Sequence, residues 1–256
     1  MKQYSILSFN FNNYECLREP KYIDDECEYV YVTDDKNAKS KNWDIVYTDK
    51  FKDNSPAFAS FYVRYHPFEF IHSNTAIIID GSIQILSSLN TIYNQFNSGG
   101  YDICIMLASY YNDTYSRGIN SWRGNSKAYN FDVSTIDKFL QFCKFYNVLN
   151  EYGIIESGFK ILKKCDTIKS LNDEIWNTCL FLKGTDDIFR VDQYVYSIIL
   201  SKKYSDKLKI LKTGRDIIQS KWMQYCKHKT NIPIYEKSNK QMWYNNKLVM
   251  DEIKYG

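Results

Sequence analysis

A carboxylate stands at the abrupt end of the most apolar stretch of this chain. Residues 75–85 read TAIIIDGSIQI, so Asp80 follows four consecutive apolar residues and is itself followed by Gly81. In an open α/β sheet, ligands bind beyond the carboxyl ends of the strands, and a carboxylate in that position faces the ligand. A glycine beside it lets the chain turn sharply. The alternative is a plain turn capped by an Asp-Gly pair, and the flanking chain has to separate the two.

Three further runs also end in polar side chains. Residues 4–9, 27–33 and 43–48 are apolar or alternating and rich in β-formers, which predicts strands. The polar residues that follow these runs are Asn10, Asn12, Asp34, Asp35 and Asp49. Repeated polar strand ends predict a common rim around a ligand. The asparagines either hydrogen-bond a base or ribose there, or simply form Asx turns.

Two more carboxylates could take part in chemistry farther along the chain. Glu156 lies between Gly153 and Gly158 in the segment GIIESGF, where glycines allow a close approach to a substrate or an ordinary turn. Asp192 and Gln193 stand at the head of a mostly apolar helix expected within residues 186–200. The helix dipole alone favours an aspartate there, so a helix cap is the alternative for Asp192.

Four basic residues could bind a ligand: Arg64 in an expected helix, and Lys212, Arg215 and His228 in the C-terminal part of the chain. Arg64 could reach a diphosphate, or could form a surface salt bridge. Lys212 and Arg215 follow an expected strand over 208–211. His228 lies in the basic aromatic run KWMQYCKHK, and of the three histidines it is the one most readily returned to a cleft by a C-terminal segment.

These residues need elements to position them. Ser55 and Pro56 form a helix start signal, and apolar residues recur at helical spacing as far as Phe68, with Pro67 ending or kinking the helix. The order of strand, strand, strand, helix and strand indicates a nucleotide-binding α/β half. We further expect helices over 87–96, 136–146 and 172–182, strands over 102–107 and 159–162, and an acceptor-side lid within 109–130.

The whole chain sets outer limits. Its 33 basic and 30 acidic residues are spread along 256 positions, so the sequence shows no footprint of a nucleic-acid partner. Seven cysteines without a C-x-x-C pair indicate reduced thiols in a cytoplasmic protein. There is no signal-peptide pattern and no apolar run of membrane-spanning length. The basic aromatic C-terminal segment could rest on the inner face of an anionic membrane.

The order of the motifs resembles that of GT-A-type glycosyltransferases. In chain order they read YVTDD, WDIV, RYHP, IIIDGSIQI, GIIESGF and RVDQY. More narrowly, the pattern resembles a glycosyltransferase-like family of bacterial polysaccharide loci and plant wall-polysaccharide proteins. There a strand ending in Asp-Gly takes the place of Asp-x-Asp, and an Arg-Asp-Gln helix start lies downstream. The likeness covers residues 4–200.

This resemblance implies a single GT-A, Rossmann-like domain: an α/β fold with a mostly parallel central sheet flanked by helices. Residues 1–106 would form the nucleotide-sugar-binding half, 107–211 the acceptor and catalytic half, and 212–256 a C-terminal extension. The implied partners are a nucleotide-sugar donor and a glycan or lipid-linked oligosaccharide acceptor. The expected donor-binding residues are Asn10, Asn12, Asp34, Asp35, Arg64, Asp80, Gly81, Ser82, Gln193 and Lys212.

The resemblance also implies a divalent ion, Mn²⁺ or Mg²⁺, at the diphosphate. Asp80 and His228 are its expected ligands. Ser82 stands where the second carboxylate of Asp-x-Asp would be, so the alternative is that Arg64, Lys212 or Arg215 holds the phosphates.

Sugar transfer with inversion needs a carboxylate that deprotonates the acceptor hydroxyl, and Asp192 and Glu156 are the candidates. With retention, the same carboxylates would stabilise positive charge at the anomeric carbon. Two other functions stay open: a carbohydrate-binding or degenerate, non-catalytic scaffold, and a nucleotidyltransferase. A nucleotidyltransferase normally has a loop rich in glycine and in Lys or Arg after its first strand. The corresponding segment here, FNFNNYECLREP, has no glycine, so this function is less well supported.

Overall fold

The computed structural model of the protein describes residues 2–107, 133–148, 155–182, 192–214, 217–218 and 220–230. The expected lid over 109–130 lies outside these residues. So do Gly153, Arg215 and the end of the chain beyond residue 230.

The first four strands form the parallel part of a central sheet. They are β1 (Tyr4–Asn10), β2 (Cys27–Thr33), β3 (Asp44–Tyr47) and β4 (Thr75–Ile79). Strand β1 pairs in parallel with both β2 and β4, and β2 pairs in parallel with β3. The chain therefore reverses its direction of sheet growth between β1 and β4, and ligands of open α/β sheets bind beyond the carboxyl ends of such a strand pair.

Three more strands complete the sheet, in the order β3-β2-β1-β4-β7-β6-β8. They are β6 (Ile103–Leu107), β7 (Ile155–Lys163) and β8 (Ile210–Gly214). Strand β7 runs antiparallel to β4 and β6, whereas β8 is parallel to β6. The expected α/β fold with a mostly parallel central sheet is confirmed.

Strand β7 is longer than the sequence predicts. It begins at Ile155 and not at residue 159, so Glu156 and Gly158 lie inside a strand and not in a turn before it. The register with β6 shifts from Ile105 opposite Lys160 to Met106 opposite Glu156. The irregularity keeps the segment that contains Gly158 paired in the sheet, although the regular alternation of side chains is interrupted there. Because a strand is predicted from that alternation, the sequence does not indicate the first four residues of β7.

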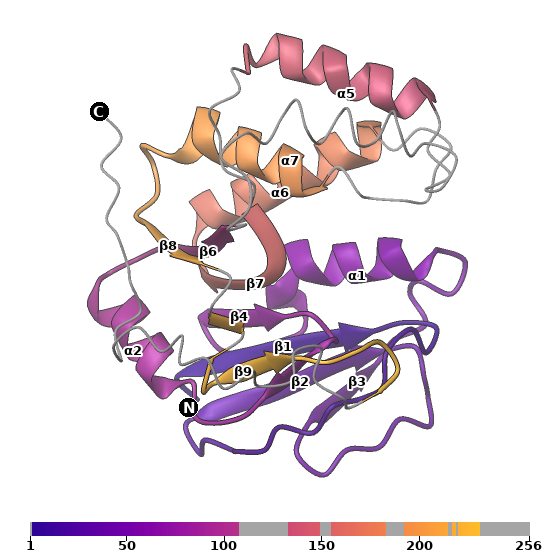
Figure 1. Ribbon diagram of the computed structural model, residues 1–256, viewed down its shortest axis with the longest axis vertical. Helices are drawn as coiled ribbons and strands as arrows, with labels where there is room; N and C mark the ends of the chain where they lie inside the picture. Colours follow the sequence, from indigo (N-terminus) through magenta and orange to yellow (C-terminus); the bar gives the residue numbers. More distant parts are fainter. Residues whose placement is uncertain are drawn as a thin grey trace, which may run out of the picture.

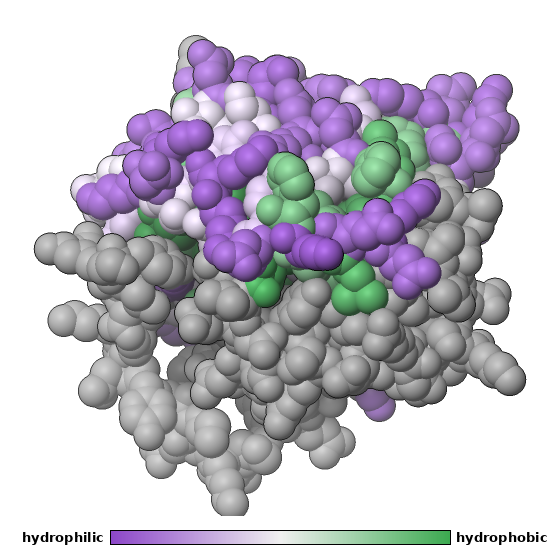
Figure 2. Space-filling model, turned by 90° about the horizontal axis from the view of Figure 1, so that it is seen from above, coloured by the Kyte–Doolittle hydropathy of each residue, from purple (hydrophilic) through white to green (hydrophobic). Residues whose placement is uncertain are grey.

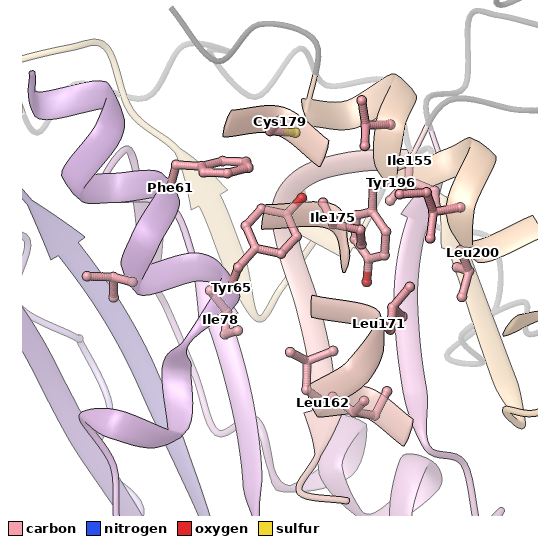
Figure 3. Packing of buried hydrophobic residues seen from close by; sticks show 14 of the residues in the cluster. Phe61, Tyr65, Ile78, Ile155, Leu162, Leu171, Ile175, Cys179, Tyr196 and Leu200 are labelled. Atoms are coloured by element: carbon pink, nitrogen blue, oxygen red, sulfur yellow. The ribbon is translucent and has the colours of Figure 1, made fainter. Parts of the chain in front are cut away.

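Helices cover one face of the sheet in two layers (Figure 1). The inner helices are α1 (Pro56–Tyr65), α6 (Asp166–Leu182) and α7 (Asp192–Ile199), and α5 (Val133–Phe145) lies outside α6 and α7. Ser55 caps α1 by accepting a hydrogen bond from the Phe58 amide at 3.2 Å. Figure 3 shows side chains of these helices packed together, among them Phe61, Ile175 and Tyr196.

Helix α6 starts six residues before the predicted segment over 172–182. Its early turns bury Ile168 and Leu171, which continue the apolar face formed by Ile175, Cys179 and Leu182. The same helical spacing therefore extends back to Asp166. The other predicted boundaries shift by one to three residues, which is the usual uncertainty of element ends.

The second face of the sheet is covered by α2 (Asn90–Ser98) and by a small two-stranded sheet. That sheet pairs β5 (Ile83–Ile85) with β9 (Met223–Tyr225) in antiparallel register. Neither short strand was predicted from the sequence. Strand β9 returns the C-terminal part of the chain to the residues that follow Asp80.

Hydrophilic side chains dominate the outer helical face seen in Figure 2, with apolar side chains among them. Phe145 at the end of α5 is 80% exposed, and Phe181 near the end of α6 is 71% exposed. Within the described part of the chain, no helix is long and apolar enough to cross a membrane.

Candidate active site

A cavity of about 850 Å³ opens at the carboxyl ends of β1 and β4, between α1 and the start of α7. This volume lies in the range of small-molecule binding sites. The structure brings together eight of the residues that the sequence singled out. They are Asn10, Arg64, Asp80, Gly81, Ser82, Asp192, Gln193 and His228.

Asp80 is fixed by backbone hydrogen bonds on both sides of its Cα. Its amide donates to the Gly158 carbonyl at 3.0 Å, and its own carbonyl accepts from the Ile83 amide at 2.9 Å. A Cβ on Gly81 would lie 2.8 Å from the Phe9 carbonyl oxygen, closer than van der Waals contact allows. Gly81 is therefore required for the turn that presents Asp80 to the cavity.

Arg64 joins two of the cavity's carboxylates. Its Nη2 donates to Asp80 Oδ1 at 2.7 Å, and its Nη1 donates to Asp192 Oδ2 at 3.3 Å. The exposed fractions of the three side chains are 13% for Arg64, 32% for Asp80 and 8% for Asp192. Water screens these ion pairs little, so Arg64 is neither a surface salt bridge nor an unpaired phosphate ligand in this structure.

Asp192 is the first residue of α7 and is buried. Removal from water raises the pKa of its carboxyl group, and the neighbouring Arg64 guanidinium opposes that rise. A carboxylate whose pKa is raised toward neutrality is a stronger base than an exposed one, which suits it to proton transfer.

Gln193 follows Asp192 and reaches the adjacent strand. Its Nε2 lies 3.4 Å from Ser157 Oγ on β7. One turn later, Ser197 Oγ donates to the Gln193 carbonyl at 2.6 Å and accepts from the Ile155 amide at 2.9 Å. These bonds attach the start of α7 to the edge of the cavity formed by β7.

His228 reaches the cavity because β9 pairs with β5. After β9, the Cys226 amide donates to the Ser82 carbonyl at 2.8 Å, which places the following residues beside the Asp80 turn. His228 Nδ1 contacts a Glu15 carboxylate oxygen, and its ring lies 5.3 Å from the Tyr14 ring, centroid to centroid. The side chain of His228 is 63% exposed.

Arg18 holds this C-terminal return in place. Its Nη2 donates to the Lys227 carbonyl at 2.9 Å, to the Thr230 carbonyl at 2.8 Å and to Glu15 Oε2 at 3.0 Å. Its Nη1 donates to the Gly81 carbonyl. One almost fully buried guanidinium thus connects the loop after β1, the turn after β4 and the segment after β9.

Five predicted site residues do not line the cavity. They are Asn12, Asp34, Asp35, Glu156 and Lys212. Asp34 accepts from the Asn12 amide at 2.9 Å, and Asp35 accepts from the Asn37 amide at 2.8 Å, so both carboxylates shape loops. Lys212 lies on β8 at the edge of the sheet, and Glu156 lies opposite Met106 within β7.

Asn10 lines the cavity, but its amide group is engaged in shaping a loop. Nδ2 donates to the Glu15 carbonyl at 2.7 Å, while Oδ1 accepts from the Glu15 amide at 2.8 Å. The turn interpretation therefore holds for Asn10. This loop in turn positions Glu15 against His228 and Arg18.

Sequence reasoning missed much of the cavity wall. The lining includes Phe9, Phe11, Tyr14, Glu15, Ser55, Pro56, Ala57, Ser60, Phe61, Ser157 and Tyr194. One signal was available: Pro56, Ser60 and Arg64 recur at intervals of four, so they share one face of α1. The aromatic residues carry no comparable signal, because Phe and Tyr are abundant throughout the chain.

The two expected metal ligands, Asp80 and His228, both line the cavity. Among the described residues, no group of three His, Cys, Asp or Glu side chains could hold a metal. Asp80 Oδ2 is not used by Arg64, and the Glu15 contact at His228 Nδ1 leaves Nε2 for another partner, as in many carboxylate-oriented histidine ligands. Two protein ligands fit an ion that takes its remaining ligands from phosphate and water.

No model of a protein family and no curated protein matches the sequence. Among solved structures, the chain is similar to mouse xyloside xylosyltransferase 1, with 10% identity and a TM-score of 0.41 over 80% of this chain and 84% of that one. It is similar to the galactosyltransferase LgtC, solved with donor and acceptor sugar analogues, with 9% identity and a TM-score of 0.43 over 82% and 73% of the two chains.

The glycosyltransferase GlyE of Streptococcus pneumoniae TIGR4 shows 8% identity and a TM-score of 0.40 over 83% of this chain and 45% of that one. All three structures carry the name of a glycosyltransferase.

Proposed function

We propose that this protein is a glycosyltransferase that moves a sugar from a nucleotide-sugar donor to a glycan or lipid-linked acceptor. The donor occupies the cavity at the ends of β1 and β4. This proposal joins the motif resemblance of the sequence to the geometry of the cavity.

The observation that carries the proposal is the Asp80–Arg64–Asp192 bridge inside a partly aromatic cavity. A sugar presents hydroxyl groups, which carboxylates and guanidinium groups hydrogen-bond, and apolar C–H faces, which aromatic rings cover. Phe9, Phe11, Phe61 and Tyr194 supply such rings in the cavity wall. Polar groups that converge beside aromatic rings in one cavity are typical of a site that fixes the orientation of a small molecule.

Asp192 is the residue proposed to act in the transfer step. Its burial and raised pKa suit removal of a proton from an acceptor hydroxyl, which is the inverting case. In the retaining case the same carboxylate stabilises positive charge on the donor sugar. Arg64 holds its orientation in either case, and Gln193 extends the polar wall beside it.

The diphosphate of the donor is proposed to lie near Asp80, Gly81 and Ser82. Asp80 and His228 would hold a Mn²⁺ or Mg²⁺ ion together with phosphate oxygens, and that ion would neutralise charge on the leaving diphosphate. Arg18 and Glu15 keep His228 at the cavity.

The test is turnover of a panel of nucleotide-sugars, followed as release of nucleoside diphosphate. We expect the wild-type protein to consume a narrow set of donors. Asp192→Asn should lower the rate by about 10²-fold or more, as loss of a general base does. Asp44→Asn, which changes an exposed carboxylate on β3 outside the cavity, serves as the control and should leave the rate unchanged.

Two results would contradict the proposal. Full activity of Asp80→Ala would remove this cavity as the donor site. Binding of glycans without any affinity for nucleotides, measured by calorimetry, would favour a carbohydrate-binding scaffold.

A further inference from the structure

Lys160 is a buried lysine at the centre of the sheet. It lies in β7 opposite Ile78 of β4 and Ile105 of β6, and its residue is only 1% exposed. Its neighbours Phe159 and Ile161 pack in the core on the face of α2, so Lys160 points to the opposite face, under α1, α6 and α7. Within the described residues, its Nζ has no hydrogen-bond partner.

Two tyrosine rings enclose the Lys160 amine. Nζ lies 4.1 Å from the centre of the Tyr65 ring and 5.2 Å from that of Tyr196. These rings come from α1 and α7, and Figure 3 shows them side by side in the core. Their buried hydroxyl groups, like Nε of the adjacent Arg64, have no partner among the described residues. Among the described residues, the faces of these two rings are the groups that contact the amine.

The Lys160 amine interacts electrostatically with Arg64, Asp80 and Asp192, the charged residues of the bridge in the cavity. Burial and the Arg64 charge lower the pKa of Lys160 well below its ordinary value, while Asp192 and Asp80 oppose the change. The titratable and charged groups on the surrounding elements are Arg64 and Tyr65 on α1, Asp80 after β4, Cys104 on β6, Cys179 on α6, and Asp192 and Tyr196 on α7. Of these, Arg64, Asp80 and Asp192 carry charge.

A buried lysine of this kind lowers the stability of the fold. Burying an amine without a hydrogen-bond acceptor destabilises a fold, and methionine would fill the same space without that cost. Arg64, Asp80 and Asp192 together carry one negative charge, and so does the group of four when the Lys160 amine is neutral. When the amine is an ammonium ion, the four groups together carry no net charge. Bound anions above the sheet favour the ammonium form, since opposite charges attract strongly where water is scarce.

We propose that Lys160 is a positioning residue that balances the charge of the Arg64–Asp80–Asp192 cluster, taking up a proton from solvent when a nucleoside diphosphate binds in the cavity. This inference rests on the proposed function. The proton bonds to Nζ, no covalent bond of the ligand changes, and the ammonium ion keeps Arg64 and Asp192 in place when negative charge arrives beside them. The residue acts through these two side chains and does not touch the ligand.

The experiment is titration calorimetry of the full chain with uridine, guanosine and adenosine diphosphates, with Mg²⁺ and again with EDTA. Binding enthalpies are compared in buffers of different ionisation enthalpy, which gives the number of protons taken up. Measurements at pH 8 and above keep the ligand phosphate ionised, because its second pKa is about 6. The matching uncharged nucleoside is the control ligand, and Lys163→Met, an exposed lysine of the same strand, is the control variant.

We expect wild type and Lys163→Met to take up protons with the diphosphate but not with the nucleoside, and Lys160→Met to bind the diphosphate without uptake. Equal uptake in wild type and Lys160→Met would overturn the inference. Diphosphate binding to the wild-type protein without proton uptake would overturn the inference as well, and this result does not depend on whether any variant folds. Absence of binding by all three diphosphates would remove the proposed function and the inference together.

Discussion

Arg64 forms ion pairs with two carboxylates of the cavity, Asp80 and Asp192. It is positioned by α1, and it neutralises part of the charge on Asp80 and on the buried Asp192. Removing one partner of a buried ion pair leaves an uncompensated charge in a region of low dielectric constant. The consequences can be measured as stability even before any ligand is known.

Arg64→Met should lower the free energy of unfolding at pH 7 by about 3–5 kcal/mol. The pKa of Asp192 is already raised by burial and rises further without the guanidinium. The folded variant then binds more protons than the unfolded chain, so its stability is lost as pH rises through the folded pKa and recovers as pH falls toward 5. Urea unfolding at pH 5 and pH 7 measures this.

Lys50→Met is the matched control for Arg64→Met. Lys50 pairs with Glu69 at 3.2 Å, and both side chains are 48% exposed, so the loss should stay below about 1 kcal/mol. An equal loss for Arg64→Met at both pH values would show that Asp192 does not carry the uncompensated charge.

Lys160→Met should be more stable than wild type at pH 7, by about 1–3 kcal/mol, because it removes a buried polar group without a partner. The lowered pKa of Lys160 means that the unfolded chain binds more protons between the folded pKa and the ordinary value. Wild-type stability therefore rises with pH in that window, and the advantage of the variant shrinks. A variant less stable than wild type at every pH in urea titrations would contradict this account.

At the scale of elements, β7 and the small β5–β9 sheet bring the site together. A Cβ on Gly158 of β7 would lie 2.8 Å from the Tyr225 hydroxyl oxygen of β9 and 3.4 Å from Asp80 Oδ2. A glycine is needed here for space, not for a special backbone angle. Three segments that are distant in the sequence meet at this position.

Gly158→Ala should cost about 1–3 kcal/mol of stability through overpacking and should weaken ligand binding by displacing Asp80. Adding Tyr225→Phe removes the crowding hydroxyl group, so the double variant should recover most of the stability. Thermal unfolding of the two single variants and the double variant measures the coupling. Strictly additive losses would show that the two side chains do not compete for this space.

Arg18→Met should release the segment after β9 from the cavity, because it removes donors to the carbonyls of Gly81, Lys227 and Thr230. Hydrogen exchange of the amides of Cys226 and Lys229 should accelerate by about tenfold or more, while the amides of β1 and β4 keep their protection. Lys227→Met removes an exposed charge in the same segment but leaves its carbonyl in place, so it should not change exchange. Unchanged protection in Arg18→Met would remove Arg18 as the anchor of His228.

At the scale of the whole molecule, the sequence predicts the strands and helices that local residue patterns specify, but not the contacts between distant segments. The β-branched run before Asp80, the Ser55-Pro56 helix start and the polar strand ends correctly indicate the mostly parallel α/β core. Asp80 lies at the edge of this core that lines the cavity. The pairing of β5 with β9 is not visible, because three-residue strands have too short a pattern and their partners are far apart in the chain.

The same limit explains why five predicted site residues do not line the cavity. Asp34 and Glu156 match the types of residue that a site needs, but Asp34 accepts a loop hydrogen bond from Asn12, Glu156 lies opposite Met106 in the sheet, and neither lines the cavity. Arg18, Glu15 and Lys160 escape sequence reasoning because their importance lies in burial and long-range contacts, which residue type alone does not reveal. The division into donor and acceptor halves stays a prediction.

The most direct test of the whole account is a crystal structure of the protein soaked with a nucleoside diphosphate and Mn²⁺. We predict density for the ligand in the cavity between α1 and α7, with its phosphates beside Asp80 and Gly81 and an anomalous signal for the metal between Asp80 and His228. Density elsewhere on the molecule, with the Arg64 bridge facing an empty cavity, would contradict the assignment of this cavity as the donor site.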